Sequence, residues 1–112
     1  MRTQIHLEDG TSYEIEGAYV QIPGYPYVKL VAHNLYLGPN AINPDVFRLT
    51  EPDYGLTRHE WDSPTIDECI TKCKEFLDMK KLTPEMWDEV REKGRQRMLA
   101  IKALQDEQAV LP

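Results

Sequence analysis

Two arginines and two tyrosines are the residues of this sequence whose chemistry best suits ligand binding. Arg91 and Arg95 lie one turn apart in a segment with helical periodicity, so their guanidinium groups would project together and could hold a phosphate. Tyr25 and Tyr54 lie in expected connections between strands, where their rings could stack on a nucleobase. Together they are one candidate site for an anionic, nucleotide-like ligand.

A solvated helix face is the alternative for the same arginines. Asp88 lies three residues before Arg91, and Glu92 lies three residues before Arg95, so each guanidinium could form a weak surface pair on its own helix. Charged runs on helices more often keep a surface soluble than bind a ligand. Both interpretations stay open at this point.

Cys69 and Cys73 have a spacing that would suit two metal ligands. Their i, i+4 spacing puts both thiols on one side of a helix, but zinc takes four ligands, usually as two pairs, and His59 alone does not supply the second pair. Two cysteines one helical turn apart are also poorly placed for a mutual disulfide. We therefore expect no metal and no cofactor, and two reduced, buried thiols.

No set of residues matches a catalytic arrangement. Arg58, His59 and Glu60 could act as an acid–base group, but on a strand His59 would point away from its two neighbours. The sequence has no Gly-rich phosphate loop and no nucleophile elbow. We therefore do not expect an enzyme, although a role for His6, His33 or His59 stays open.

The net charge of −6 is distributed unevenly along the 112 residues. Residues 1–62 contain nine acids and four bases, a balance of −5, whereas residues 63–112 contain ten acids and nine bases, a balance of −1. Because phosphate attraction dominates nucleic-acid affinity, this charge argues against nucleic-acid binding. The acidic half could instead imitate nucleic acid and bind a basic cleft on a protein. No apolar run suggests a membrane helix or a signal peptide, so the cytoplasm is expected.

Residues 1–62 have the alternation of an antiparallel sheet with five to six strands. Residues 3–8 and 11–16 predict a hairpin around Asp9-Gly10, after which Gly17 should break the strand or make a bulge and residues 18–22 should form a third strand. Residues 27–32 predict the next strand, which residues 35–37 either extend or follow as a short separate strand. Residues 38–44 are expected to form the main irregular loop. Strands at 45–50 and 56–61 predict a second hairpin around residues 52–55.

Residues 63–112 predict a helical hairpin. Ser63-Pro64 and Thr83-Pro84 are typical helix starts, each with a capping hydroxyl followed by proline. Apolar residues at spacings of three and four give the first helix one buried face: Ile66, Cys69, Ile70, Cys73 and Leu77. The second helix could run for about 24 residues, or roughly 36 Å at 1.5 Å per residue.

The second helix is long for a domain of this size, so we expect it to pair with its copy in a homodimer through residues 84–108. Gly94, in the middle of its apolar stripe, would either let two helices approach closely or kink the helix. The stripe that would form the dimer interface is Trp87, Val90, Gly94, Met98, Ile101 and Leu104.

The order of elements predicts a single α+β domain with both helices on one face of the antiparallel sheet. The opposite face is expected to be polar, solvated or a partner surface. The expected function is that of a small, non-enzymatic protein, such as an accessory protein of a phage or mobile element, that binds or inhibits a macromolecule. The layout is also similar to that of phage proteins that sequester cyclic nucleotide signals, which would imply a nucleotide-like ligand. A nucleic-acid-binding protein and a small hydrolase rank below these two.

Overall fold

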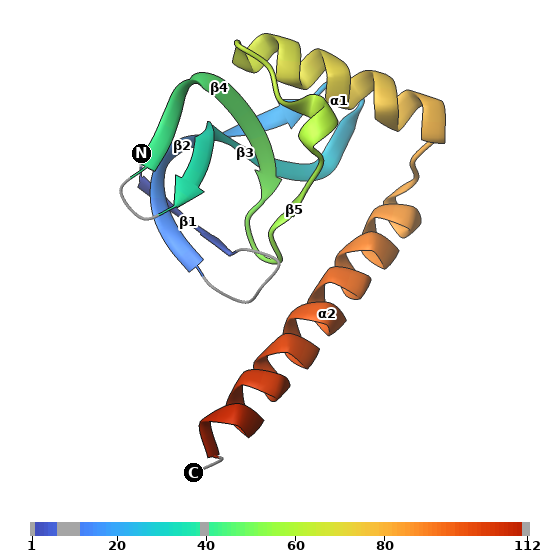
Figure 1. The fold of residues 1–112 in the computed structure, drawn as a ribbon. Helices are drawn as coiled ribbons and strands as arrows, with labels where there is room; N and C mark the ends of the chain where they lie inside the picture. Colours follow the sequence, from blue (N-terminus) through green and yellow to red (C-terminus); the bar gives the residue numbers. More distant parts are fainter. Residues whose placement is uncertain (1, 7–11, 39–40, 111–112) are drawn as a thin grey trace.

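Five strands followed by two helices make up this computed structural model, which describes residues 2–6, 12–38 and 41–110. One antiparallel sheet has the order β1-β2-β3-β4-β5, and its strands are β1 (Arg2–His6), β2 (Ser12–Ile22), β3 (Tyr25–Gly38), β4 (Ala41–Glu51) and β5 (Leu56–Thr57). The helical elements are the 3-10 helix η1 (His59–Trp61), α1 (Ile66–Lys80) and α2 (Pro84–Val110). Figure 1 shows the sheet curled on itself with α1 across one side of it. The predicted α+β fold is confirmed.

The β2 strand is continuous, so the prediction of two strands separated at Gly17 was wrong. Residues 12–16 of β2 pair with β1, and residues 17–22 pair with β3. A Cβ atom on Gly17 would lie 2.8 Å from Val31 Cγ1 and 2.9 Å from the Ala32 carbonyl oxygen. Glycine therefore lets β2 pass close to β3 where it changes pairing partner. The predicted turn at Asp9-Gly10 lies outside the described residues.

The β3 and β4 strands are also longer than predicted. Residues 35–37 extend the strand at 27–32, which was one of the two possibilities for them, and residues 41–44 of the expected loop belong to β4; residues 39–40 are not described. Asn34 pairs with Phe47 but Leu35 pairs with Asn43, so residues 44–46 bulge from the ladder. Asn34 Nδ2 donates to the carbonyl oxygens of Pro44 and Val46, at 3.2 and 3.4 Å. The bulge lets a strand contain a proline.

The second predicted hairpin forms, but its last strand ends at Thr57 rather than at residue 61. Residues 59–61 make a 3-10 turn, in which the Trp61 amide donates to the Arg58 carbonyl oxygen at 3.1 Å. This turn directs Trp61 inward, where the side chain is 8% exposed. The strand alternation assumed for Arg58, His59 and Glu60 therefore does not apply.

The buried face of α1 is the one predicted from its periodicity. Cys69, Cys73 and Leu77 are buried, and the core that they join also contains Leu30 and Leu49 of the sheet. Figure 1 shows α1 lying across β2 and β4. The face of the sheet that α1 covers therefore holds the main core.

The cap of α1 differs from the prediction. Thr65, not Ser63, is the N-cap, and its hydroxyl accepts from the Glu68 amide at 3.2 Å. Ser63 instead exchanges two main-chain hydrogen bonds with Phe47, at 2.8 and 3.2 Å. The connection between η1 and α1 is therefore paired to β4.

The opposite face of the sheet was expected to be polar, solvated or a partner surface, but it also contains buried apolar residues. Ile5, Ile15 and Val31 form a second buried cluster, with Ile5 and Val31 fully buried. This cluster joins β1, β2 and β3, the three strands that contain its residues, in a sheet that is curled (Figure 1). The curl thus provides a small second core.

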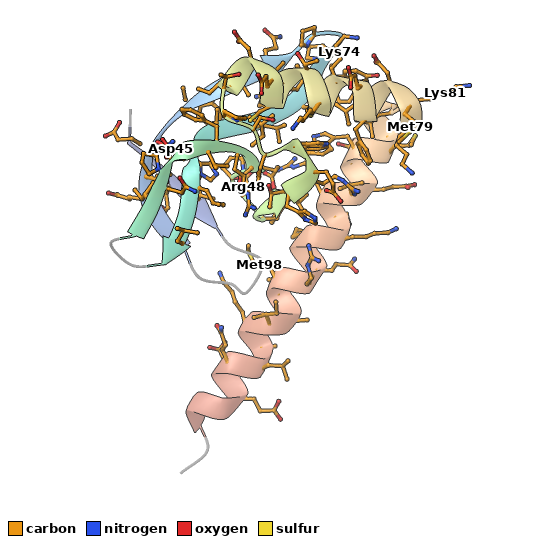
Figure 2. The ribbon with its side chains drawn as sticks, turned by 45° about the horizontal axis from the view of Figure 1, so that its top comes forward. Asp45, Arg48, Lys74, Met79, Lys81 and Met98 are labelled. Atoms are coloured by element: carbon orange, nitrogen blue, oxygen red, sulfur yellow. The ribbon has the colours of Figure 1, made fainter. Side chains whose placement is uncertain are left out.

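The α2 helix begins at Pro84 as predicted, and the Thr83 hydroxyl accepts from the Met86 amide at 3.2 Å. Lys81 closes α1 in the left-handed conformation, with φ of 53°. From that point the two helices diverge, so α2 does not fold back along α1 in the expected hairpin (Figure 1). Figure 2 shows Met98 on the side of α2 that faces the sheet, and the helix continues beyond it away from the sheet.

Candidate functional site

Arg91 and Tyr54, two of the four predicted ligand-binding residues, lie together where α2 passes the β4–β5 turn. The Arg91 guanidinium lies 5.3 Å from the centre of the Tyr54 ring. Its Nη2 donates to Asp53 Oδ2 at 2.9 Å, and its Nε lies 3.9 Å from Glu51 Oε1. The predicted pair with Asp88 does not form. Arg91 therefore attaches α2 to the turn, and two carboxylates already occupy the guanidinium.

Glu51 fixes the shape of this turn. Its side chain is 3% exposed, and its two carboxylate oxygens accept from the amides of Asp53 and Tyr54, at 2.9 and 3.0 Å. Burial raises the pKa of the Glu51 carboxyl above its usual value. The turn is therefore held by its own hydrogen bonds as well as by Arg91.

Arg95 pairs with Glu92 on its own helix, as the sequence had indicated. The two guanidinium–carboxylate hydrogen bonds are 2.8 and 2.5 Å long, and Gln96 donates to the same carboxylate at 3.1 Å. The hydrogen bond from Arg95 lowers the pKa of Glu92 to about 2. Neither arginine of the candidate phosphate site is without a carboxylate partner, so the geometry does not favour an anion there.

Tyr25 holds α1 to the sheet and makes no described contact with the other three candidates. It is buried, and its hydroxyl donates to Asp78 Oδ1 at 2.6 Å. That hydrogen bond raises the pKa of Tyr25 to about 12, and Lys74 also pairs with Asp78 at 2.7 Å. The structure thus separates Tyr25 from the arginines.

The predicted dimer stripe of α2 divides into a covered and an exposed part. Gly94 is buried against Tyr54 and Leu56, and Met98 is 7% exposed. Gly94 therefore permits a close approach of α2 to its own sheet. The chain itself covers these two positions, whereas Val90 and Leu104 are 42% and 58% exposed.

The remaining candidates from the sequence are the histidines and the two cysteines, and the structure does not bring them together in one site. His33 is buried, with Nε2 2.8 Å from Thr50 Oγ1 and Nδ1 2.7 Å from the Asn34 carbonyl oxygen, and burial lowers its pKa. His59 is 82% exposed beside Glu60, and the side chain of His6 lies outside the description. Cys69 and Cys73 are free and buried, as predicted, and burial raises the pKa of Cys73 to about 12. Over residues 2–6, 12–38 and 41–110, no group of three metal-ligating side chains gathers.

A groove that the sequence did not reveal lies between α1 and α2, with a volume of about 400 Å³. We call it the α1–α2 groove. Three charged side chains also line it, namely Arg58, Lys80 and Glu89. Its apolar lining includes Leu30, Trp61, Phe76, Leu77, Trp87 and Val90. This volume and this largely apolar lining are typical of a small-molecule binding site.

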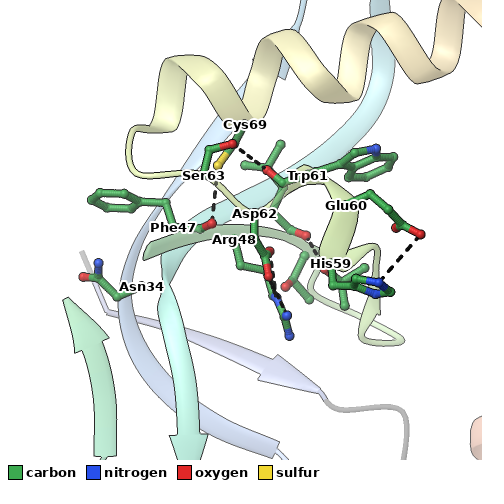
Figure 3. Close-up of polar contacts among 12 residues, drawn as sticks. Asn34, Phe47, Arg48, His59, Glu60, Trp61, Asp62, Ser63 and Cys69 are labelled. Carbon is green, nitrogen blue, oxygen red and sulfur yellow. Dashed lines mark hydrogen bonds and ion pairs between the residues drawn. The ribbon is translucent and has the colours of Figure 1, made fainter. Parts of the chain in front are cut away.

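Trp61 is held in this groove by contacts of the two residues that follow it and by a neighbouring ring. Arg48 of β4 forms a forked pair with Asp62, with Nη2–Oδ2 and Nε–Oδ1 distances of 2.7 and 3.0 Å. Ser63 donates through its hydroxyl to the Trp61 carbonyl oxygen at 3.4 Å (Figure 3). The Trp61 ring meets the Phe76 ring edge to face at 5.6 Å. Both tryptophans of the chain line the groove, and their positions 61 and 87 were the only signal in the sequence.

Comparison of the chain with protein-family models, curated proteins and solved structures found no match. In the described part of the chain, no helix is both long and apolar enough to cross a membrane.

Proposed function

We propose that the protein is a non-enzymatic binding protein that acts on another macromolecule, and that α2 joins two copies of it. The observation that carries this proposal is the part of α2 beyond Met98. Met98 is buried, whereas Leu99 and Leu104 farther along are 51% and 58% exposed. Apolar side chains are thus presented on a helix that has left its own sheet (Figure 2).

A helix that extends in this way gains stability from a partner. Residues 99–110 make about three turns, and isolated helices shorter than ~12–15 residues are marginal in water. Burying Leu104 and the half-buried Ile101 against a second helix would stabilise those turns through the hydrophobic effect. The projecting segment therefore suits a helix–helix interface.

A second copy of the chain is the partner that the charges favour. Residues 63–112 carry a net charge of −1, whereas residues 1–62 carry −5. Two copies can approach through their nearly neutral helices with little repulsion, while their acidic sheets would repel each other. Two-fold dimers are also the commonest oligomers. The acidic sheet of each copy would stay exposed for a basic partner.

Light scattering on size-separated protein tests the proposal, and the expected mass is twice the 13.0 kDa of the chain. Leu104→Glu places a charge in the proposed interface and should give a monomer. Ala103→Glu adds the same charge at the neighbouring exposed position on a different side of the helix, and should remain a dimer. A monomeric wild-type protein, or equal behaviour of the two variants, would contradict the proposal.

A further inference from the structure

One side of α2 carries accessible apolar residues along most of the helix. Met86 and Val90 near its start are 37% and 42% exposed, and Leu104 near its end is 58% exposed. The half-buried Ile101 lies between the last two. The spacings of four, eleven and three residues return to one side of a helix with 3.6 residues per turn. We call these four residues the outer stripe.

The α1–α2 groove lies on the same side of α2 as the outer stripe. Met86 and Val90 line the groove, whereas Arg91 turns away from it to Asp53 of the β4–β5 turn. The outer stripe therefore begins in the groove and continues past Met98, onto the part of α2 that has left the sheet (Figure 2). One chain thus presents an apolar groove at one end of the stripe and an apolar helix segment at the other.

We propose that the α1–α2 groove receives residues 99–107 of α2 from a second copy of the chain, in an antiparallel pair of α2 helices. This inference rests on the proposed dimer and states where its interface lies. In this register Val90 faces the partner's Ile101. Met86 then faces the partner's Leu104, because the position numbers of facing residues in an antiparallel pair have a nearly constant sum, here 191 and 190. Two-fold symmetry makes each contact twice and closes the assembly at two copies.

The charges of α2 favour the antiparallel direction. Glu107 is exposed near the end of α2, while Lys80 lines the groove beside the start of α2 and is followed by the exposed Lys81. A parallel pair would bring the acidic ends of two helices together, whereas an antiparallel pair brings each acidic end to the two lysines of the other copy. Glu89 of the groove lies level with the partner's Lys102, away from Glu107.

Lys93 and Arg97 lie between the two apolar ends of the interface. Both are exposed, and their long side chains can extend along the helix surface and keep their charges in water. The two helices are therefore held together mainly at the ends of the outer stripe, where apolar area is buried.

Val90→Cys combined with Ile101→Cys tests the register. Within one helix the two positions are eleven residues, or about 16 Å, apart, whereas the Cα atoms of a disulfide lie within about 7 Å. Only a bond between copies is therefore possible. We expect oxidation to convert this double variant into a covalent dimer on a non-reducing denaturing gel. The wild-type protein is the control and should not cross-link, since Cys69 and Cys73 are buried.

The two single variants decide the direction of the helices. In the antiparallel pair, position 90 of one copy lies about 16 Å from position 90 of the other along the helix axis, so Val90→Cys alone should not cross-link. The same holds for Ile101→Cys. A parallel pair would bring equal positions together and cross-link both single variants, which would overturn the inference. A double variant that is dimeric by light scattering but does not cross-link would overturn it as well.

Met86→Glu tests the groove apart from the projecting segment. It should weaken the dimer about tenfold or more, measured by light scattering over a range of protein concentrations, because it places a charge against the partner's Leu104. Ala103→Glu adds the same charge on another side of α2 and should leave the dimer unchanged. If Leu104→Glu is monomeric while Met86→Glu dimerises like the wild type, this inference fails although the proposed dimer stands. A monomeric wild-type protein would refute both.

A charge exchange tests the contact at the end of the groove. Lys80→Glu should weaken the dimer by about two- to fivefold, because an exposed ion pair contributes little and the variant replaces attraction by repulsion. Adding Glu107→Lys to the same chain should restore the affinity. If the double variant binds no more tightly than Lys80→Glu alone, the two residues do not meet across the interface and the proposed register is wrong.

Discussion

Gly94 on α2 allows the close contact between this helix and the β4–β5 turn to be tested by one substitution. A Cβ atom at position 94 would lie 2.9 Å from Leu56 Cδ2 and 3.2 Å from Tyr54 Cβ. Gly94→Ala therefore has two opposing effects. Alanine is favoured over glycine in a helix by about 1 kcal/mol, whereas crowding of a packed site costs roughly 1–3 kcal/mol.

The nature of the two neighbouring atoms decides which effect is larger. Leu56 Cδ2 is the end of a flexible side chain and can rotate away. Tyr54 Cβ is attached to the main chain of the turn, and the Glu51 carboxylate holds that turn through two amides. Relief then requires α2 to move. We expect Gly94→Ala to change the free energy of unfolding by between about zero and a loss of 2 kcal/mol.

Urea unfolding followed by circular dichroism measures this change. Lys93→Gly, at the adjacent exposed position, is the control for helix propensity and should lose most of about 1 kcal/mol. If Gly94→Ala instead stabilises the protein by about 1 kcal/mol, or raises Tm by roughly 4–8 °C, propensity acts alone. The close approach of α2 to Tyr54 and Leu56 would then be refuted.

Two further predictions concern charged and titrating groups. Arg91→Ala should lower the free energy of unfolding by about 1 kcal/mol, because it removes a surface ion pair to Asp53 and a contact with the Tyr54 ring. Thermal unfolding measures this loss, with Lys93→Ala as the control variant. Equal Tm values for the two variants would contradict the prediction. For His33, burial lowers the pKa below 6.5, so the unfolded chain binds a proton that the folded chain does not. The free energy of unfolding should therefore fall as the pH drops below 6.5, and His33→Gln should flatten this dependence in urea titrations; an unchanged slope would refute it.

The helices were the part of the fold that sequence pattern predicted best, because their determinants are local. The burial of Cys69, Cys73 and Leu77 follows from a spacing of three and four residues that a helix alone makes contiguous. The strand boundaries were less predictable, since they depend on pairing partners. A glycine between two alternating segments is typical of a strand break, yet β2 continues through Gly17 because this part of the strand pairs with β3.

The two arginines show the same division between local and distant effects. Arg95 pairs with Glu92, three residues before it, which is one of the two possibilities that the sequence left open. Arg91 has a similar neighbour in Asp88 but pairs with Asp53, which is 38 residues away. A surface pair within one helix contributes little, so a carboxylate on a preformed turn can replace it once α2 is placed.

The α1–α2 groove could not be predicted because Trp61, which lines it, lies where the regular strand pattern stops. The strand assumed for residues 56–61 gave Trp61 no defined surroundings. Its position depends instead on the 3-10 turn that ends at Trp61 and on two tertiary contacts directly after it, Arg48 with Asp62 and Phe47 with Ser63. These contacts bury the indole N–H without an acceptor. Neither the turn nor a contact with a residue of β4 leaves a periodic pattern in the sequence, so the burial of Trp61 could be found only from the structure.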